Sequence, residues 1–200
     1  MKKEKNKEMD VVFLLDRSGS MSGMEEDTIG GYNSYLEKQR KNVNTKITTI
    51  LFDDQYEVLK MREDIKDVKN ITANEYYVRG CTALYDAIGK TIKTIENSVK
   101  NNKVLFVITT DGLENASREY NKNSVSKLIK KHKDWEFMYI GANIDSYAEG
   151  QSIGIKTSNI ANYKRTRLGT RALFDSVCKA TACYEASDSI GSSWKDNLEK

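Results

Sequence analysis

Three short, strongly apolar runs place the tightest limit on how this chain can fold. They span residues 11–15, 104–108 and 136–140, and a polar residue or a glycine follows each of them. A run of this length without polar alternation indicates a strand that is buried on both faces. Strands of that kind occur in parallel sheets covered by helices on both sides. We therefore expect helical segments between the runs.

The segments between and around these runs have the spacing of amphipathic helices. Apolar side chains recur at intervals of three and four residues in residues 82–99, and further stretches of the same kind occupy 24–41, 125–132 and 173–184. This spacing places the apolar side chains in one stripe along a helix. A further short helix is expected near residues 145–150.

Two neighbouring segments have the character of a hairpin. Residues 46–52 and 55–61 are rich in strand-forming side chains, and only Asp53 and Asp54 separate them. So short a connection predicts a tight antiparallel pair. A weaker strand is expected near residues 158–161. The predicted fold class is α/β, with a doubly wound, mainly parallel sheet, one antiparallel edge strand and helices on both faces.

The length and composition of the chain fit one domain. A chain of 200 residues is long enough for one α/β core and leaves little room for a second. We expect a charged tail at residues 1–8, a domain at 9–185 and a polar, frayed tail at 186–200. The three cysteines are widely spaced, which indicates reduced thiols rather than a disulfide framework.

The charge pattern argues against nucleic acid and membrane partners. The formal net charge is only +3, whereas a dedicated nucleic-acid binder usually has a concentrated basic stripe. We interpret the basic cluster of Lys164, Arg165, Arg167 and Arg171 as a solvated face, with a patch for an acidic partner as the alternative. The run at 11–15 is too short for a signal peptide or a membrane span. A cytoplasmic location is therefore expected.

Oxygen-bearing side chains follow two of the predicted inner strands. The first strand continues into Asp-Arg-Ser-Gly-Ser at 16–20, and the second into Thr-Thr-Asp-Gly at 109–112. A third segment, residues 79–84, precedes a predicted helix and contributes a threonine. In an open α/β sheet, ligands bind beyond the carboxyl ends of the strands. The candidate metal-binding residues are Asp16, Ser18, Ser20, Thr82 and Asp111.

These five side chains supply only oxygen atoms. An oxygen-only set selects hard cations, which makes Mg²⁺ the expected ion and Mn²⁺ or Ca²⁺ the alternatives. If the three hydroxyls bind directly and the two carboxylates hold them from outside, the cation keeps most of its charge. Direct binding by either carboxylate is the other possibility. One open coordination position would then favour a carboxylate from a partner protein.

The three motifs together resemble the von Willebrand factor type A domain. Residues 11–21 are similar to the strand and loop of its metal-ion-dependent adhesion site, residues 80–84 to its threonine loop, and residues 110–112 to its third motif. The resemblance extends over residues 9–185 by element order. It implies a doubly wound sheet and Mg²⁺-dependent binding of a protein. None of the five candidate positions departs from the family pattern.

Two stretches narrow the resemblance within that family. Residues 110–117 and 140–143 look more like stand-alone bacterial and phage members than like integrins. Cys81 occupies a position where the family often has glycine, which leaves the candidate ligands unaffected.

Other interpretations remain open from the sequence. An Asp and a Ser at a strand end can also form only a turn and a helix cap. The same fold could serve as a scaffold or regulatory subunit with a purely structural metal. A Mg²⁺-dependent phosphatase of the haloacid dehalogenase type would need a second Asp where Ser18 stands. The single histidine, His132, lies on a helix stripe away from the strand ends, so we predict no catalytic residues and no enzyme.

Overall fold

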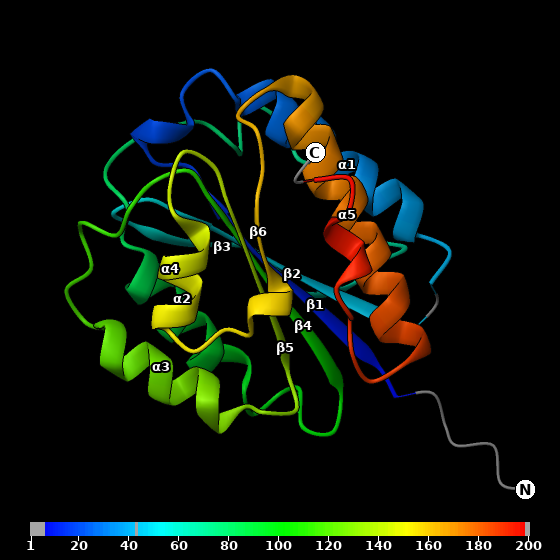
Figure 1. Ribbon diagram of the computed structural model, residues 1–200. Coiled ribbons are helices and arrows are strands. Elements are labelled where there is room, and N and C mark those ends of the chain that lie inside the picture. The colour runs from blue at the N-terminus through cyan, green and yellow to red at the C-terminus, as the bar shows by residue number, and fades with distance from the viewer. Residues whose placement is uncertain (1–6, 43, 199–200) are drawn as a thin grey trace, which may run out of the picture.

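A computed structural model describes residues 7–42 and 44–198 of the chain. It contains one sheet of six strands between two layers of helices (Figure 1). The strands are β1 Met9–Asp16, β2 Thr45–Phe52, β3 Tyr56–Asp64, β4 Lys103–Thr110, β5 Glu136–Gly141 and β6 Ile160–Asn162. The α-helices are α1 Glu25–Gln39, α2 Leu84–Ile95, α3 Lys122–Lys131, α4 Ser146–Ser152 and α5 Arg167–Ala186. Short 3-10 turns occur at Gly19–Met21 (η1), Thr157–Asn159 (η2) and Ser193–Lys195 (η3).

The strand order confirms the predicted fold class. It runs β3-β2-β1-β4-β5-β6. All neighbouring pairs are parallel except β2 and β3, the hairpin at the edge of the sheet. The chain builds outward from β1 to β3 and then crosses back through α2 to begin β4 on the other side of β1. The order therefore reverses between β1 and β4, which is where open α/β sheets bind ligands.

Alternate side chains of β1 enter two separate cores. Val11, Phe13 and Leu15 pack with α1 and α5, whereas Val12 and Leu14 pack with α2 and α3. Figure 1 shows the same division, with α1 and α5 together on one face and α2, α3 and α4 on the other. Successive strand residues point to opposite faces, so a run that is apolar throughout is what a doubly covered strand needs.

The C-terminal segment differs from the frayed tail expected after Ser187. Ile190, Trp194 and Leu198 are buried in the core cluster that includes α5, and the Trp194 indole donates a hydrogen bond to the Ser158 carbonyl at 3.0 Å. The expectation of fraying is wrong for residues 187–198, because three large apolar side chains within a polar stretch can cover an apolar surface. Residues 1–6 and 199–200 of the two expected tails lie outside the described residues.

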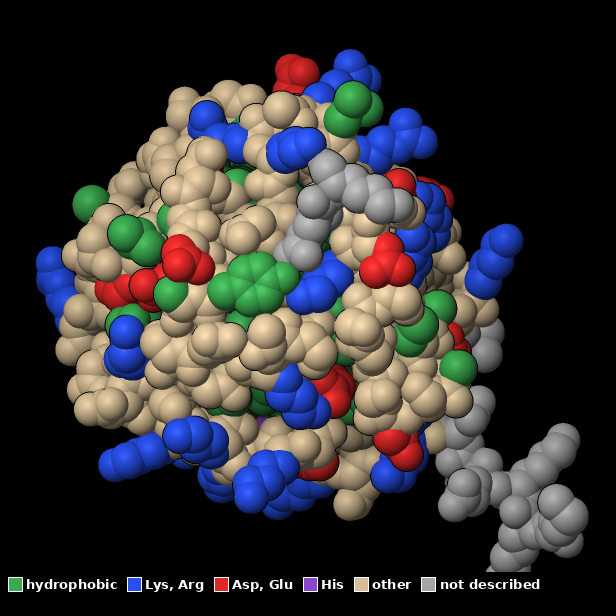
Figure 2. Space-filling model, in the orientation of Figure 1, with side chains coloured by type: hydrophobic (Ala, Val, Ile, Leu, Met, Phe, Trp, Pro, Cys, Tyr) green, Lys and Arg blue, Asp and Glu red, His purple; other side chains and the backbone are tan. Residues whose placement is uncertain are grey.

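The surface is charged but mixed in sign. On the face shown in Figure 2, lysine and arginine side chains are spread around the rim with acidic side chains between them. Among the described residues, no helix combines the length and apolar character that crossing a membrane would require.

Candidate metal centre

The five candidate residues come together at the carboxyl edge of the sheet. Asp16 is the last residue of β1, and Asp111 directly follows β4, its neighbour. Ser18 and Ser20 lie in the turn that β1 enters, and Thr82 lies in the loop before α2. Asp16 and Asp111 are about 95 residues apart in the sequence. They come to the same edge of the sheet because β1 and β4 pair in parallel.

The three hydroxyl groups form one hydrogen-bonded cluster. The Ser18 Oγ lies 2.9 Å from the Ser20 Oγ, and the Thr82 hydroxyl donates to the Ser18 Oγ at 3.0 Å. Ser18 and Thr82 are buried, whereas Ser20 is exposed. The cluster opens into a depression of about 430 Å³ that Leu113 and Asn143 also line. The hydroxyl groups therefore converge, and the depression that they line includes the exposed Ser20.

Asp16 is fully buried behind this cluster. Its Oδ1 accepts a hydrogen bond from the Ser18 backbone N–H at 2.7 Å, and its Oδ2 accepts one from the Thr110 hydroxyl at 2.5 Å. Its own carbonyl accepts the Tyr76 hydroxyl at 2.5 Å. Both carboxylate oxygens are thus occupied by groups that fix the turn after β1, which suits a role in holding Ser18 in place.

Asp111 is only half satisfied. Its Oδ2 accepts a hydrogen bond from Arg165 Nε at 2.9 Å. Its Oδ1 is buried and has no hydrogen-bond partner in the described part of the chain. A buried polar oxygen left unpaired costs about 1–3 kcal/mol, and more when the group is charged. A cation beside this oxygen would remove that cost.

Gly112 leaves room where the oxygens converge. A Cβ atom on this residue would lie 2.9 Å from both the Ser20 Oγ and the Thr82 Oγ1. Contacts that short do not occur with a real methyl group, so any other residue would push the hydroxyls away. The glycine keeps the space between Ser20 and Thr82 open.

The residues fit an oxygen-coordinated cation. The Ser18 hydroxyl lies within hydrogen-bond range of those of Ser20 and Thr82, Asp111 lines the same depression with one carboxylate oxygen unpaired, and Gly112 keeps the space free. No group of three or more His, Cys, Asp or Glu side chains among the described residues is placed to hold a metal. A site here would therefore depend on hydroxyl oxygens, which favours a hard cation such as Mg²⁺ over a thiophilic one.

A buried ion-pair cluster positions the threonine loop. Asp53, which directly follows β2, accepts hydrogen bonds from Arg17 Nε at 3.1 Å and from Arg79 Nε at 2.6 Å. Arg17 is fully buried, and its Nη1 also lies 2.7 Å from the Glu57 carboxylate. The loop between Arg79 and Thr82 is thereby tied to the turn that carries Ser18.

The loop after β4 holds Thr82 from the other side. The Thr82 backbone N–H donates to the Asn115 side chain at 2.9 Å, and the Asn115 N–H donates back to the Thr82 carbonyl at 3.0 Å. The loop itself is organised by two carboxylates near α2 that accept backbone N–H groups, Glu114 and Asp86. Thr82 therefore has a fixed backbone on both sides.

Sequence reasoning missed most of these supporting residues. Arg165 belongs to the basic cluster that the sequence indicates to be a solvated face or a patch for an acidic partner, and in the structure its guanidinium contacts Asp111 within the site. Asp53 was interpreted only as a hairpin residue. Tyr76 packs behind the site, whereas Tyr77 is 44% exposed and lies beside Arg17 and Arg79. The available signal was a buried-strand end followed by Asp-Arg-Ser at 16–18, where an arginine next to the core needs a carboxylate partner.

Burial changes the acidity of Asp16. Desolvation raises the pKa of Asp16 from 3.8 to about 6, partly opposed by the hydrogen bonds from Thr110 and Ser18. The folded chain therefore binds this proton more tightly than the unfolded chain does. Without a divalent cation, the Asp16 contribution to stability falls as the pH rises from about 4 to about 6 and stays constant above that.

We expect this pH dependence to disappear when Asp16 is replaced by asparagine. In EDTA, the Asp16→Asn variant should gain stability relative to the native chain as the pH rises through this window, by up to about 3 kcal/mol at 1.36 kcal/mol per pKa unit. Urea unfolding of both proteins across pH values from about 4 to about 7 measures the difference. A difference that is the same at every pH would contradict the expectation.

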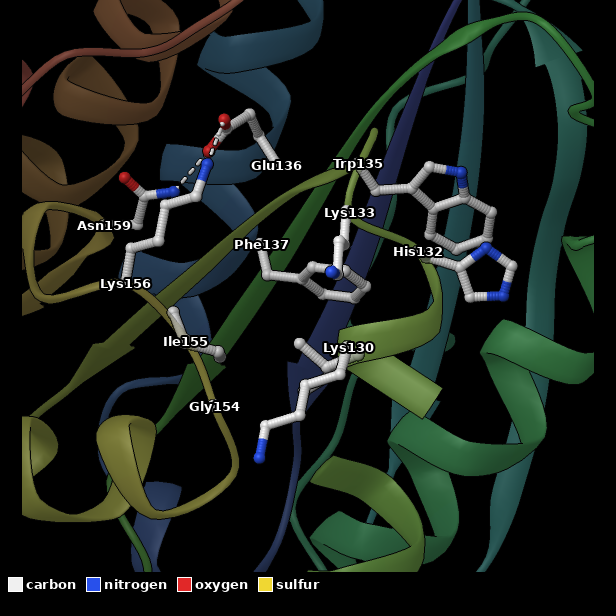
Figure 3. A pocket seen from close by; sticks show the side chains of 11 residues that line it. Lys130, His132, Lys133, Trp135, Glu136, Phe137, Gly154, Ile155, Lys156 and Asn159 are labelled. Carbon is white, nitrogen blue, oxygen red and sulfur yellow. Dashed lines mark hydrogen bonds and ion pairs between the residues drawn. The ribbon is translucent and has the colours of Figure 1, made fainter. Parts of the chain in front are cut away.

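A separate apolar hollow lies at the opposite end of the sheet. It has a volume of about 270 Å³ and is bordered by the end of α3, the start of β5 and the segment after α4 (Figure 3). Its one carboxylate, Glu136, is engaged by Lys156 at 2.7 Å and by Asn159 at 2.5 Å. His132 stacks on Trp135 there and lies 3.2 Å from Glu96. This hollow offers no converging set of oxygen ligands.

Comparisons with known proteins identify the fold. No family model and no curated protein sequence matches the chain. Among solved structures, the pilus adhesin SpaC from Lactobacillus rhamnosus GG aligns with a TM-score of 0.71 at 12% identity, over 88% of this chain and 30% of that one. The von Willebrand factor type A structure from Catenulispora acidiphila aligns with a TM-score of 0.65 at 12% identity, over 88% and 43%.

A mussel protein gives a further match. Proximal thread matrix protein 1 from the mussel byssus, in a structure with zinc occupying its MIDAS motif, aligns with a TM-score of 0.61 at 16% identity, over 89% of this chain and 46% of that one. The chain thus spans less than half the length of each of these three proteins. At such identities the likeness concerns the fold alone. The chain has the fold of von Willebrand factor type A domains.

Proposed function

We propose that the chain is a divalent-metal-dependent protein-binding module. Ser18, Ser20 and Thr82 would bind the cation directly, while Asp16 and Asp111 would hold it from outside or bind it themselves. The cation, Mg²⁺ in this proposal with Mn²⁺ or Ca²⁺ as alternatives, would supply a positively charged contact for an Asp or Glu carboxylate of the partner. The module would carry out no catalysis.

One observation carries this proposal above the others. The buried Asp111 Oδ1 has no hydrogen-bond partner in the described residues, and Asp111 lines the same depression as the three hydroxyl residues, where Gly112 has no side chain to fill the space between Ser20 and Thr82. A turn or a helix cap alone would need no such opening. In addition, Ser18 caps η1 without a side-chain hydrogen bond to the backbone, which is not the arrangement of an ordinary N-cap.

Two alternatives are separated from the proposal by their chemistry. In a phosphatase, a second carboxyl would stand two residues after Asp16 to transfer protons, and Ser18 stands there instead. In a scaffold with a purely structural metal, the metal would change stability but not partner binding. The cytoplasmic location and the bacterial or phage origin expected from the sequence stay predictions, as does the absence of nucleic acid and membrane partners.

We expect Asp16→Ala and Ser18→Ala to abolish metal-dependent partner binding. Binding of Mn²⁺ to the purified chain, followed by electron paramagnetic resonance, tests the site first. A pull-down from the source cells in Mg²⁺ and in EDTA then tests the partner. Proteins retained only in Mg²⁺ should be lost with both variants. Ser18→Ala removes a hydroxyl oxygen from the cluster, and Asp16→Ala removes the carboxylate that holds Ser18 in place.

The matched control is Ser22→Ala. Ser22 is an exposed serine two residues beyond Ser20 in the same turn, and its side chain lies outside the hydroxyl cluster. This variant should bind Mn²⁺ and the partner as the native chain does. If EDTA changes thermal stability but no retained protein depends on Mg²⁺, the scaffold alternative is correct. Retention that survives both Asp16→Ala and Ser18→Ala would refute the proposed site.

A further inference from the structure

We infer that Arg165 is a second contact for the carboxylate that the metal site takes from a partner. This inference rests on the proposed function. It adds Arg165, which lies in a loop distant in the sequence, to the five candidate residues. Arg165 lies between β6 and α5, in the stretch whose basic residues the sequence left as either a solvated face or an acidic-partner patch. The contacts of Arg165 favour the second alternative, a patch for an acidic partner.

Three hydrogen bonds fix the Arg165 guanidinium at the edge of the site. Nε donates to the Asp111 Oδ2 at 2.9 Å, and Nη2 donates to the Ser20 carbonyl at 2.7 Å and also to the Ser22 carbonyl. These acceptors belong to both strand-end loops that carry candidate ligands. An arginine anchored in this way cannot move freely, so it would lose little conformational freedom when a ligand binds.

The guanidinium still has unused donors. It carries five N–H groups, and the hydrogen bonds above use those of Nε and Nη2. Within the described residues, Nη1 makes no hydrogen bond, and it is not among the buried atoms that lack a partner. The Arg165 side chain is 32% exposed. Two N–H groups of a guanidinium that is bound to Asp111 therefore remain open to solvent.

The net charge of the metal-loaded site favours an anionic ligand for these two N–H donors. The carboxylates of Asp16 and Asp111 together neutralise one divalent cation. Arg165 then leaves the loaded site with a net positive charge, which favours an anionic group over a neutral one. A carboxylate has two oxygens, and guanidinium N–H groups bind carboxylates with strong, charge-assisted hydrogen bonds. Arg165 would thus select carboxylate partners over other oxygen donors.

The opposite interpretation makes a different prediction for metal affinity. If Arg165 only oriented Asp111, its removal would weaken metal binding. If it acts on the partner carboxylate, its removal relieves repulsion of the cation, so metal affinity should stay or rise while carboxylate affinity falls. The two effects have opposite signs and can be measured separately.

The experiment uses Mn²⁺ as the metal and acetate as the carboxylate. Acetate that takes the open position on bound Mn²⁺ displaces water, which lowers the water proton relaxation rate. We expect Arg165→Gln to bind Mn²⁺ at least as tightly as the native chain and to need about tenfold more acetate for half of the effect. The matched control is Arg167→Gln, because the Arg167 side chain is 91% exposed and its nearest carboxylate oxygen is 3.9 Å away; it should behave as the native chain.

The outcomes separate this inference from the proposed function. A native chain that binds no Mn²⁺, or whose bound Mn²⁺ does not respond to acetate, contradicts the proposed function itself. Normal Mn²⁺ binding with an unchanged acetate requirement in Arg165→Gln overturns the inference alone, as does weaker Mn²⁺ binding with an unchanged acetate requirement. Circular dichroism checks the fold. If Arg165→Gln does not fold, Arg165→Lys keeps the charge without the planar fork and should need several-fold more acetate.

Discussion

Replacing Asp53 with alanine is expected to lower the free energy of unfolding by about 3–5 kcal/mol. Asp53 is fully buried and accepts hydrogen bonds from Arg17, Arg79 and the Gln55 backbone. Its loss would leave the fully buried Arg17 guanidinium with only the half-exposed Glu57 as a counter-charge. An uncompensated buried charge is among the most costly defects that a single substitution can create.

The neighbouring aspartate provides the control for this change. Asp54 is exposed in the same hairpin turn, so Asp54→Ala should alter the free energy of unfolding by no more than about 0.5 kcal/mol. Urea unfolding of the two variants and the native chain measures both values. If Asp53→Ala and Asp54→Ala cost the same, the Arg17–Asp53–Arg79 cluster does not hold the loops as described here.

Asp53 also matters for the candidate site. Its carbonyl accepts the Ala83 N–H at 2.8 Å, and its side chain binds Arg79, so it holds the loop of Thr82 at both ends. The cluster thus links the end of β2 to a hydroxyl of the site. A stability loss in Asp53→Ala should therefore be accompanied by weaker Mn²⁺ binding even in conditions where the variant is folded.

The substitution Gly112→Ala should strongly weaken metal binding while leaving the fold intact. The new methyl group would lie 2.9 Å from the Ser20 and Thr82 hydroxyl oxygens, so these oxygens could no longer converge. The backbone of Gly112 is not in the left-handed region, so alanine adds no backbone strain there. We expect Mn²⁺ affinity to fall by about 10- to 100-fold, the range typical of a disturbed ligand shell.

A second glycine shows whether the effect is local. Gly30 lies exposed within α1, and a Cβ atom there would meet nothing within 4 Å. Gly30→Ala should leave Mn²⁺ binding unchanged and stabilise the fold by about 0.5–1 kcal/mol, because alanine is the better helix former. Mn²⁺ titrations and urea unfolding of both variants provide the measurements. Native Mn²⁺ affinity in Gly112→Ala would show that no cation binds between these hydroxyls.

The apolar pattern alone was enough to predict the fold class. Continuous apolar runs become strands covered on both faces, because each successive side chain must enter one of two cores. Periodic segments became helices, although α5 begins at Arg167, before its apolar stripe. The start is set locally, since the Thr166 side chain accepts the Gly169 N–H. The end of the chain was misjudged because composition does not show that Trp194 finds an apolar surface.

The candidate ligands could be selected from the sequence because they follow strand ends. Parallel strands place their carboxyl ends at one edge, so the strand pattern alone predicts that Asp16 and Asp111 are neighbours. Their roles as metal ligands remain predictions. The structure adds the distances between the hydroxyls and the unpaired oxygen of Asp111.

The residues that support the site were decided only by tertiary structure. Arg165 reaches Asp111 across 54 positions of sequence, and Arg17 reaches Asp53 across 36. Local pattern carries no information about such pairs, because a charged side chain in a loop is usually solvated and becomes a partner only where the fold buries a counter-charge beside it. The apolar pattern and the strand ends therefore predict the sheet, its helical layers and the edge that carries the candidate ligands. The packing of distant loops alone decided which charges surround that edge.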